Sequence, residues 1–407
     1  MTALEWLDSL QGSGIRPGLS RMRALLRRLG NPHQAVSSII VAGTNGKGST
    51  SATLASILEA AGYRTGIYTS PHLVDIRERW VIGGAPIDPT LLDESIWMMK
   101  GAAEASGILP TYFEALTLIA FIAFARASCE LAVLEVGMGG RLDATNVVHP
   151  IAALITPIGF DHMEYLGHTL RKIAAEKAGV IHRGAVVLTS NRDEPIVSVL
   201  RKRAETFANA FHVIPAGAKV PLSPLVGDFQ RDNIALAMRT AEVLASRLTR
   251  ITPEAIVRGV AATRWRGRLE RYVIGGKDVR VDGCHNAHAA AAIAPFIAAN
   301  MGTPRTLVFG IMSDKNVGAV AAILFPLFSR IITTDPYPPR AEPALTLAKI
   351  AGEYGAEAIV EADPESAIRR ALASDARSVL VAGSLYLAGA AIALLDAIRE
   401  ERGEKSS

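Results

Sequence analysis

The chain has 407 residues, of which 49% are hydrophobic and 20% are charged, and its formal net charge is +4. This length favours two or three domains, and the apolar content is ample for buried cores. The nearly balanced charge and the 6% content of aromatic residues argue against a nucleic-acid-binding protein.

Two cysteines, Cys129 and Cys284, are too few for a disulfide framework, which is typical of proteins from a reducing cytoplasm. The opening residues MTALEWLDSL carry acids where a signal peptide needs basic and then apolar residues. The longest apolar runs are too short to span a membrane. We therefore expect a soluble cytoplasmic protein without a membrane partner, and no sequence feature favours an oligomer over a monomer.

The segment 39–50 (IIVAGTNGKGST) is an apolar run followed by a glycine-rich turn and the start of a helical pattern that continues to Ala61. This order predicts a strand, a phosphate-binding loop and a helix. Glycines let backbone N–H groups turn toward phosphate oxygens, and Lys47 supplies a charge for the outer phosphates. Ser49 or Thr50 offers a hydroxyl to magnesium.

The loop departs from the usual Gly-x-x-x-x-Gly-Lys-Ser/Thr spacing, because Val41 and Gly48 stand where a glycine and a hydroxyl are expected. A tight turn that binds no phosphate is therefore the alternative. The lysine within the turn and the helix behind it favour a nucleoside triphosphate as the ligand.

A short strand is predicted over 65–68, followed by the loop TSPHL and an edge hairpin over 80–87. Open α/β sheets bind ligands beyond the carboxyl ends of their strands. Candidate site residues are therefore Ser70, His72, Arg77, Glu78 and Arg79, although SPH alone is an ordinary turn.

A helix is predicted over 89–105, and the next helix begins at Thr111. Thr111 and Glu114 are three residues apart in a capping-box pattern. For Glu114, this structural role and a functional role are both open.

Two further apolar strands carry polar side chains toward their carboxyl ends. The strand 131–136 contains Glu135, and a carboxylate in an apolar strand is costly unless it is paired or bound to a metal. The strand 151–156 leads to His162, for which a core role and a ligand role are both open. Lys177 lies in the last turn of the next helix, where a lysine ordinarily compensates the helix dipole.

A strand at 185–189 and helices over 194–208, 230–248 and 253–262 follow. The start of the second of these helices offers side-chain amides that suit the edge of an adenine ring, although this pattern alone is weak. The arginine-rich segment 264–270 (RWRGRLE) is the predicted linker between two domains.

Beyond the linker, apolar strands alternate with helices, which predicts a second, smaller parallel sheet with crossover helices. These strands are expected near 272–282, 306–310, 330–334, 357–360 and 378–382. The loops that follow them carry polar groups, and we expect polar groups from both domains to face one cleft.

Eight segments resemble, in this order, the folylpolyglutamate synthase and dihydrofolate synthase family of the Mur ligase superfamily: GTNGKGS, TSPHL, EVGMGGRLDATN, ITPIGFDH, AAEKAGVI, WRGRLE, DGCHNAH and GSLYLAG. The resemblance implies an α/β fold with a P-loop-containing parallel-sheet ATPase domain followed by a smaller Rossmann-like α/β domain. Residues 1–266 would form the ATP-binding Mur ligase-like domain, and residues 267–407 the glutamate-ligase domain.

The resemblance also implies roles for individual residues. ATP would be bound by Gly43, Thr44, Asn45, Gly46, Lys47, Gly48, Ser49, Thr50, Gln230, Asn233, Arg268 and Asp282. Mg²⁺ would be bound by Ser49, Ser70, Glu135 and His162. The acceptor and the incoming glutamate would contact His72, Arg79, Glu114, Asp143, His285, Ser384 and Tyr386. The implied catalytic residues are Lys47, Lys177 and His285, and Lys177 matches a lysine that is carbamylated in relatives. A second Mg²⁺ and a requirement for K⁺ are left open.

The implied reaction adds L-glutamate to folates, and to dihydropteroate in bifunctional members. The γ-phosphoryl group of ATP moves to a carboxylate, the α-amine of glutamate attacks the acyl phosphate, and ADP and phosphate are released. Such a transfer between anions needs charge neutralisation and alignment, which Lys47, Arg268 and Mg²⁺ would provide.

The chain departs from the family pattern in places. Cys284 and Ala287 replace residues of the pattern Asp-Gly-Ala-His-Asn-Pro. His149 stands where bifunctional members often carry an acid, so the resemblance favours folate elongation over the use of dihydropteroate.

Two alternatives remain. Muramyl-peptide ligases place a whole domain before the phosphate loop, where this sequence has 42 residues, and the length argues against them. A nucleotide-dependent binding protein that has lost ligase chemistry is the alternative from a different class.

Overall fold

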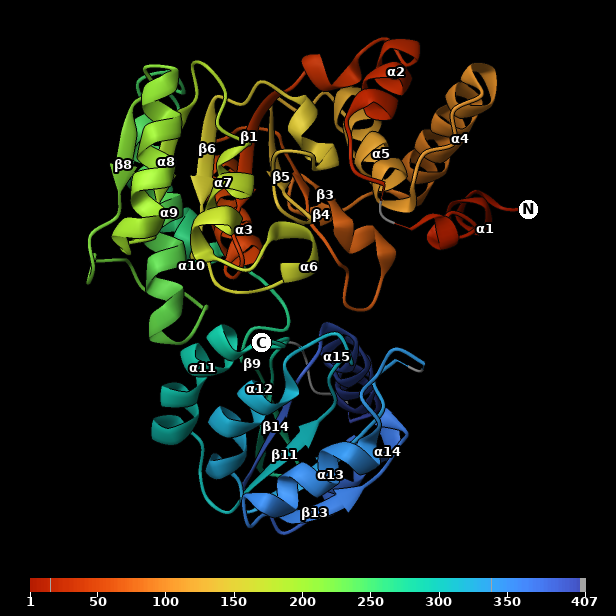
Figure 1. Ribbon diagram of the computed structural model, residues 1–407, viewed down its shortest axis with the longest axis vertical. Coiled ribbons are helices and arrows are strands. Elements are labelled where there is room, and N and C mark those ends of the chain that lie inside the picture. The colour runs from red at the N-terminus through yellow and green to blue at the C-terminus, as the bar shows by residue number, and fades with distance from the viewer. Residues whose placement is uncertain (15, 338, 403–407) are drawn as a thin grey trace. The chain divides into compact units, whose positions relative to one another are not determined.

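The computed structural model describes residues 1–14, 16–337 and 339–402, and the chain divides into two compact units (Figure 1). The first unit comprises Met1–Ser70, Arg77–Pro224 and Gln230–Arg264, and the second comprises Pro71–Ile76, Leu225–Phe229 and Trp265–Ser407. The chain therefore changes unit after Arg264, two residues before the boundary that the sequence predicts. The sequence alone also assigns 71–76 and 225–229 to the first domain, whereas both segments lie with the second unit.

These two short segments belong to the second unit because they pack into its interior. Leu73 lies so close to Gly389 that a Cβ atom there would come within 2.0 Å of the Leu73 carbonyl oxygen. Val226 and Phe229 pack against a buried cluster of the second unit that includes Phe309. These contacts join residues that are far apart in the sequence, so local composition gives no sign of them.

The first unit is built on an 8-stranded sheet in the order β4-β3-β2-β5-β1-β6-β7-β8. The strands β2, β5, β1, β6, β7 and β8 are parallel neighbours, and β3 and β4 form the predicted edge hairpin. The strand bounds are β1 Ser37–Ala42, β2 Thr65–Tyr68, β3 Trp80–Ile82, β4 Ala85–Pro86, β5 Leu131–Glu135, β6 Ala152–Ile155, β7 Val186–Thr189 and β8 Phe211–Val213. Apolar residues fill the parallel strands, as expected for a sheet that helices cover on both faces.

The helices of the first unit connect and cover these strands. They are α1 Ala3–Asp8, α2 Ser20–Arg28, α3 Lys47–Ala60, α4 Pro89–Ser106, α5 Tyr112–Arg126, α6 Met163–Leu166, α7 Leu170–Ala178, α8 Glu194–Thr206, α9 Asp228–Leu244 and α10 Pro253–Ala262. Short 3₁₀ helices are η1 Gln11–Ser13, η2 Pro32–Gln34, η3 Ile76–Arg79 and η4 Ala144–Val147. The capping box predicted at Thr111 is confirmed, because Thr111 and Glu114 exchange side-chain and backbone hydrogen bonds.

The second unit is built on a 6-stranded sheet in the order β13-β12-β11-β14-β10-β9. Its strands are β9 Glu270–Ile274, β10 Lys277–Val281, β11 Arg305–Phe309, β12 Arg330–Thr333, β13 Glu357–Val360 and β14 Ser378–Ala382. Its helices are α11 Ala287–Asn300, α12 Val317–Leu324, η5 Phe325–Leu327, α13 Ala344–Glu353, α14 Pro364–Ala373 and α15 Leu385–Glu401.

The prediction of one strand near 272–282 and of an all-parallel second sheet is wrong in one respect. β9 and β10 are two strands that pair antiparallel, and the remaining neighbours are parallel. Gly275 and Gly276 have φ values of 56° and 79°, which let the chain reverse in a tight turn. Two adjacent glycines within an apolar run are the signal for this hairpin.

Alternate residues of the second sheet enter two separate cores. Leu307 and Phe309 face the core formed with α11, α12 and α13, whereas Val308 faces the core formed with α14 and α15. Leu380 and Val381 alternate in the same way. Helices therefore cover both faces, as the period-2 pattern of a strand requires.

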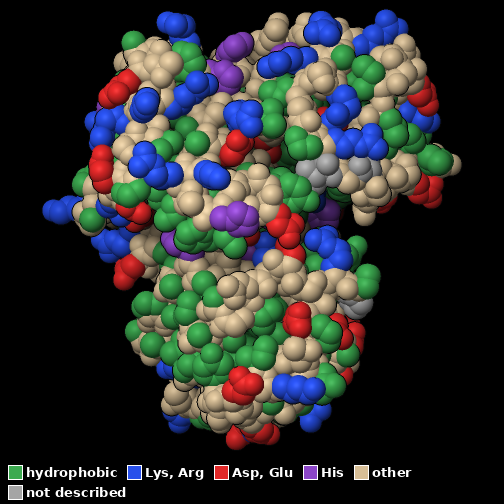
Figure 2. Space-filling view, in the orientation of Figure 1, with side chains coloured by type: hydrophobic (Ala, Val, Ile, Leu, Met, Phe, Trp, Pro, Cys, Tyr) green, Lys and Arg blue, Asp and Glu red, His purple; other side chains and the backbone are tan. Residues whose placement is uncertain are grey.

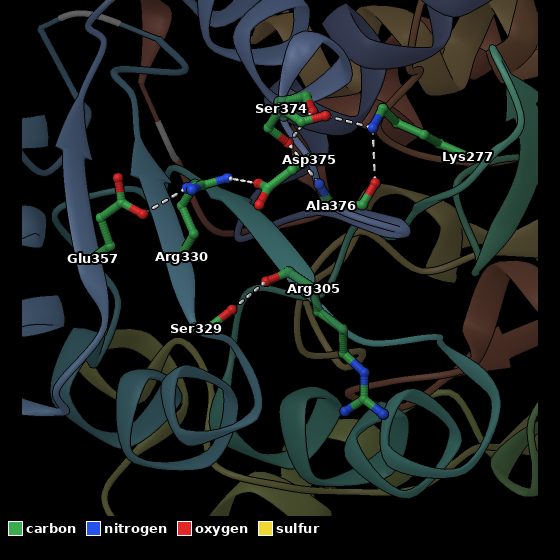
Figure 3. Close-up of polar contacts among 9 residues, drawn as sticks. Lys277, Arg305, Ser329, Arg330, Glu357, Ser374, Asp375 and Ala376 are labelled. Atoms are coloured by element: carbon green, nitrogen blue, oxygen red, sulfur yellow. Dashed lines mark hydrogen bonds and ion pairs between the residues drawn. The ribbon is translucent and has the colours of Figure 1, made fainter.

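Polar side chains satisfy one another at the amino ends of the strands in the second sheet (Figure 3). Arg330 pairs with Glu357 at 2.8 Å and with Asp375 at 2.6 Å. The ammonium group of Lys277 donates to the carbonyl oxygens of Ser374 and Ala376 at 2.5 and 2.8 Å. Arg330 and Lys277 at this edge therefore have oxygen partners. Over the described ranges, no helix is both long and apolar enough to cross a membrane.

In the first unit, α10 packs so closely on α3 that a Cβ atom on Gly259 would lie 2.3 Å from Ile57 Cα. We expect Gly259→Ala to destabilise the protein by about 1–3 kcal/mol, because the backbones must separate. In α4, the matched change Gly101→Ala meets no atom within 4 Å and should stabilise by about 1 kcal/mol through helix propensity. Thermal and urea unfolding of the whole chain measure both, and equal effects would contradict close packing at Gly259.

Candidate active site

The predicted phosphate loop connects β1 to α3, and its glycines are required by close backbone contacts. Gly43 has a φ of 150°, and a Cβ atom there would lie 1.8 Å from the Thr156 hydroxyl oxygen. Gly46 has a φ of 85°, and a Cβ atom there would lie 2.2 Å from Asn233 Oδ1. The Thr44 amide donates to the Pro157 carbonyl at 2.9 Å, which holds the loop against the end of β6.

Two residues of α9 predicted to approach the nucleotide lie beside this loop. Asn233 donates from Nδ2 to Gln230 Oε1 at 2.9 Å, and both side chains are buried. Gln230 Nε2 and Ser49 Oγ are buried without a hydrogen-bond partner among the described residues. A buried polar atom without a partner is costly, so these two atoms fit a ligand that supplies the missing bonds.

Lys177 is a buried amine that contacts the phosphate loop directly. Its Nζ donates to the Gly43 carbonyl oxygen at 2.7 Å, and the residue is 4% exposed. Burial, followed by repulsion from Lys47, lowers the pKa of Lys177 to about 7, against the opposing attraction of Asp161 and Asp143. A substantial fraction of this amine is therefore neutral near physiological pH, which ordinary helix-end lysines are not.

The predicted metal ligands follow neighbouring strands of the sheet. Ser70 follows β2, Glu135 ends β5 beside Val41 of β1, and His162 follows β6. Since β2, β5, β1 and β6 are adjacent and parallel, these residues and the phosphate loop share one edge of the sheet. His162 has a φ of 50°, and its backbone N–H donates to the carboxylate of Asp161 at 3.0 Å.

Asp143 has a clear structural role in the same region. Its carboxylate accepts from the backbone N–H groups of Gly137, Met138 and Thr145 at 3.0 Å each, and from the Thr145 hydroxyl at 2.6 Å. Burial raises the pKa of Asp143. The side chain thus fixes the glycine-rich loop after β5, and its charge also acts on Lys177.

Two other predicted substrate residues of the first unit also have protein partners. Glu114 forms its capping box and a bidentate ion pair with Arg21, at 3.1 and 2.9 Å. Arg79 is 7% exposed, and its carbonyl oxygen accepts from the Thr69 N–H at 3.0 Å. His72, predicted with them, lies in the segment that belongs to the second unit.

In the second unit, predicted residues gather where β10 and β14 end. Asp282 accepts from the N–H groups of Leu269 and Cys284 at 2.9 and 2.8 Å, and burial raises its pKa against the attraction of Arg268. A Cβ atom on Gly283 would lie 2.7 Å from Arg268 Nη1, and His285 Nδ1 lies 2.9 Å from the Gly283 carbonyl oxygen. Arg268, Asp282 and His285 are thus held together by one loop.

Ser384 and Tyr386 begin α15 at the neighbouring strand end. Ser384 is the N-cap, and its Oγ accepts from the Leu387 N–H at 3.0 Å. Tyr386 is 43% exposed and stacks on Tyr337, with 4.6 Å between ring centroids and 18° between ring planes. The N–H of Gly383 donates to the Cys284 carbonyl at 3.0 Å, which joins this strand end to the loop after β10.

Sequence reasoning missed several neighbours of these residues. Thr156 and Asp161 lie within the segment ITPIGFDH, from which the sequence analysis selected only His162 as a candidate ligand. Arg21 and Tyr337 are distant in sequence from the residues they contact, and no local pattern marks them. Only the pairing of strands and loops in the fold brings them into place.

Matches to known families cover most of the chain. Residues 41–236 match the Mur ligase middle domain, and residues 267–385 match the Mur ligase glutamate ligase domain. The folylpolyglutamate synthase of Lacticaseibacillus casei is 33% identical over 405 residues, covering 91% of this chain and 92% of that enzyme. The dihydrofolate synthase/folylpolyglutamate synthase of Bacillus subtilis is 35% identical over 343 residues, covering 77% of this chain and 80% of that enzyme. The chain belongs to the folylpolyglutamate synthase/dihydrofolate synthase family of Mur ligases.

Solved structures agree with this membership of the Mur ligases. A Mycobacterium tuberculosis folylpolyglutamate synthase complexed with ADP and AMPPCP has a TM-score of 0.87 at 31% identity, covering 97% of this chain and 98% of that one. E. coli FolC in complex with DHPP and ADP has a TM-score of 0.86 at 29% identity, covering 98% and 99%. The predicted fold class is confirmed. A probable bifunctional folylpolyglutamate synthase/dihydropteroate synthase of Halobacterium salinarum is 36% identical, and this chain spans 50% of its length.

In this Mur ligase, the residues predicted to bind Mg²⁺ offer few charged ligands. No group of three or more His, Cys, Asp and Glu side chains suited to a metal occurs in the described part of the chain. The predicted set contains one carboxylate, one imidazole and two hydroxyls. Mg²⁺ keeps several waters and needs only one or two carboxylates beside substrate phosphates, so this donor set fits Mg²⁺ bound together with a nucleotide.

The lowered pKa of Lys177 makes the stability of this Mur ligase depend on pH. Between about pH 7 and its ordinary value of 10.5, the unfolded chain holds a proton on Lys177 that the folded protein lacks. The free energy of unfolding should therefore rise with pH across this window, by up to about 1.4 kcal/mol per pH unit. Lys177→Met should lose this rise.

The measurement is urea unfolding at several pH values in buffers freed of carbon dioxide. Lys172→Met, on the exposed face of the same helix, is the control and should keep the wild-type slope. An unchanged pH dependence in Lys177→Met would show that this amine keeps its ordinary pKa.

Proposed function

We propose that this chain is an ATP-dependent ligase that adds L-glutamate to folates through an acyl phosphate and releases ADP and phosphate. The observation that carries the proposal is the phosphate loop with its orphaned Ser49 hydroxyl, its α9 neighbours and the buried Lys177, in a chain of this family. The use of dihydropteroate as a second acceptor belongs to the same proposal. The protein would act as a cytoplasmic monomer.

ATP is the nucleotide that this site fits. The backbone N–H groups of the loop and the Lys47 ammonium suit the phosphates, and Lys47 Nζ already lies 3.2 Å from the Thr44 carbonyl oxygen within the loop. The buried amides of Gln230 and Asn233 offer hydrogen bonds to a base. Arg268 and Asp282 of the second unit are assigned to phosphate and ribose.

Mg²⁺ would be held by Ser49, Ser70, Glu135 and His162, and when bound it would neutralise charge on the transferring phosphoryl group. A second Mg²⁺ is part of the same proposal. The assay should be run with and without K⁺, because a requirement for this ion is left open.

Lys177 is the residue whose surroundings most favour a chemical modification. Its neutral amine can attack carbon dioxide, forming an N–C bond and releasing a proton, so that a carbamate replaces an ammonium group. Reversal of charge at this position would change repulsion from Lys47 into attraction. It would also place an anion beside the predicted Mg²⁺ ligands, where cations are needed for phosphoryl transfer.

The remaining assigned residues would handle the acceptor and the incoming amino acid. His72, Glu114 and Asp143 are assigned to substrate binding. Arg79, His285, Ser384 and Tyr386 are assigned to glutamate, whose α-amine must lose a proton before it attacks the acyl phosphate. Phosphate then leaves and an amide remains.

The proposal predicts ADP release that depends on an acceptor. Purified protein with magnesium-ATP and glutamate should release ADP with tetrahydrofolate, and a bifunctional enzyme should also do so with 7,8-dihydropteroate. Turnover with tetrahydrofolate alone would define an elongating enzyme. If neither acceptor causes ADP release, the chain is not a folate ligase. That result would favour a muramyl-peptide ligase or a nucleotide-binding protein without ligase activity.

A second prediction concerns the buried amine. Lys177→Ala should reduce ligation by at least about 100-fold, because a positioned electrostatic group of the transition state is lost, while binding of ADP stays near normal. Lys172→Ala, from the same helix, should keep full activity. Native mass spectrometry in bicarbonate should detect one added carbon dioxide in Lys172→Ala and none in Lys177→Ala. Near-normal turnover of Lys177→Ala would remove this residue from the mechanism.

A further inference from the structure

Imidazole and guanidinium side chains gather in the first unit at the edge of the sheet opposite the phosphate loop. His33 precedes β1, His149 precedes β6, His182 precedes β7, and Arg203 in the last turn of α8 precedes β8. Because β1, β6, β7 and β8 are neighbouring parallel strands, their amino ends share one edge. Figure 2 shows histidines beside Lys and Arg side chains at the upper end of this unit.

The histidines of this edge contact one another, and one has a defined tautomer. The rings of His149 and His182 meet edge to face with centroids 5.6 Å apart. Asn146 donates from Nδ2 to the carbonyl oxygens of Arg141 and Gly179, at 3.1 Å each, so its Oδ1 faces His182 Nε2 at 2.8 Å. Nε2 of His182 therefore carries the hydrogen, and Nδ1 is the atom that takes a further proton.

Two nitrogen atoms of this edge lack hydrogen-bond partners among the described residues. Arg203 Nε and His33 Nδ1 are buried without a hydrogen-bond partner among the described residues. The Arg203 guanidinium lies 4.6 Å from the centre of the Phe207 ring, which holds it in place. Within residues 1–14, 16–337 and 339–402, neither Arg23 nor Arg203 forms an ion pair.

The charges that act on the half-buried imidazoles of His33 and His182 have one sign. Burial and then His149 lower the pKa of His33, and burial followed by His149, Arg203 and Arg23 lowers the pKa of His182. No carboxylate contributes to either shift. The imidazoles are therefore neutral near pH 7, beside two guanidinium groups without counter-ions.

The corresponding edge of the second sheet shows the usual arrangement. There Arg330 has two carboxylate partners, and Lys277 has two carbonyl partners (Figure 3). At the amino edge of the first sheet, by contrast, Arg203 Nε is buried without an acceptor, whereas Arg23 is exposed to solvent. An anion from solution would supply the acceptor that Arg203 lacks.

We propose that Arg23, His33, His149, His182 and Arg203 form a binding site for a phosphate group, separate from the nucleotide site. Guanidinium groups pair with phosphate oxygens through planar forks of N–H donors, and imidazoles donate once they are protonated. Two guanidinium charges match a dianion. Binding of the dianion favours protonation of the neighbouring histidines. The inference does not depend on the proposed ligase activity.

Histidine ring signals in NMR spectra of the whole chain test this site. The protein with magnesium-ADP is titrated with inorganic phosphate near neutral pH, and separately with glycerol 2-phosphate. We expect the signals of His149 and His182 to shift and the pKa of His182 to rise by about one unit. His212 in β8, whose charged neighbour is Arg239, should not respond. A response to the monoester identifies a phosphate group on a larger molecule, whereas a response to inorganic phosphate alone identifies the free ion.

Matched variants of α8 separate this site from general charge effects. Arg203→Gln should abolish the phosphate-induced shifts. Arg201→Gln removes the same charge from the same helix, but Arg201 is paired with Glu194 at 3.2 Å, so the shifts should remain. His149→Gln, at an exposed position, should weaken phosphate binding without affecting folding. If no ring signal moves in millimolar phosphate, or if both arginine variants respond alike, the site does not exist.

Discussion

The hydrogen bond from the buried Lys177 amine to the Gly43 carbonyl is the interaction on which the proposed active site depends. It fixes the C-terminal turn of α7 to the start of the phosphate loop. The amine is buried, and Lys47 repels it, so its proton is held weakly. Near neutral pH this amine is therefore divided between a charged and a neutral form.

Close backbone approach is the second constraint, and glycine is its chemical basis in both units. Gly43 and Gly46 admit Thr156 and Asn233 against the phosphate loop. In the second unit, a Cβ atom on Gly383 would lie 2.5 Å from the Gly310 carbonyl oxygen. Side chains at these positions would push apart the strand ends that carry the assigned ligand-binding residues. Glycine permits the close approach because it has no Cβ atom.

Cations at the amino edges of the two sheets differ in their hydrogen-bond and ion-pair partners. In the second unit the cations are neutralised by acids and carbonyl groups, which is the arrangement that stability favours. In the first unit Arg203 and the neighbouring histidines have no acidic partner among the described residues. The buried, unpartnered Arg203 Nε therefore differs from the paired cations of the second sheet.

Local sequence patterns were sufficient to predict most helices and strands and the phosphate loop of the candidate site. The helix 170–178, the capping box at Thr111 and the phosphate loop follow from short-range spacing, because helices, caps and turns are governed by residues a few positions apart. The hairpin at Gly275–Gly276 and the membership of 71–76 in the second unit depended on contacts between distant segments. So did the burial of Lys177, because desolvation is set by everything packed around an amine, and no spacing along the chain encodes that enclosure.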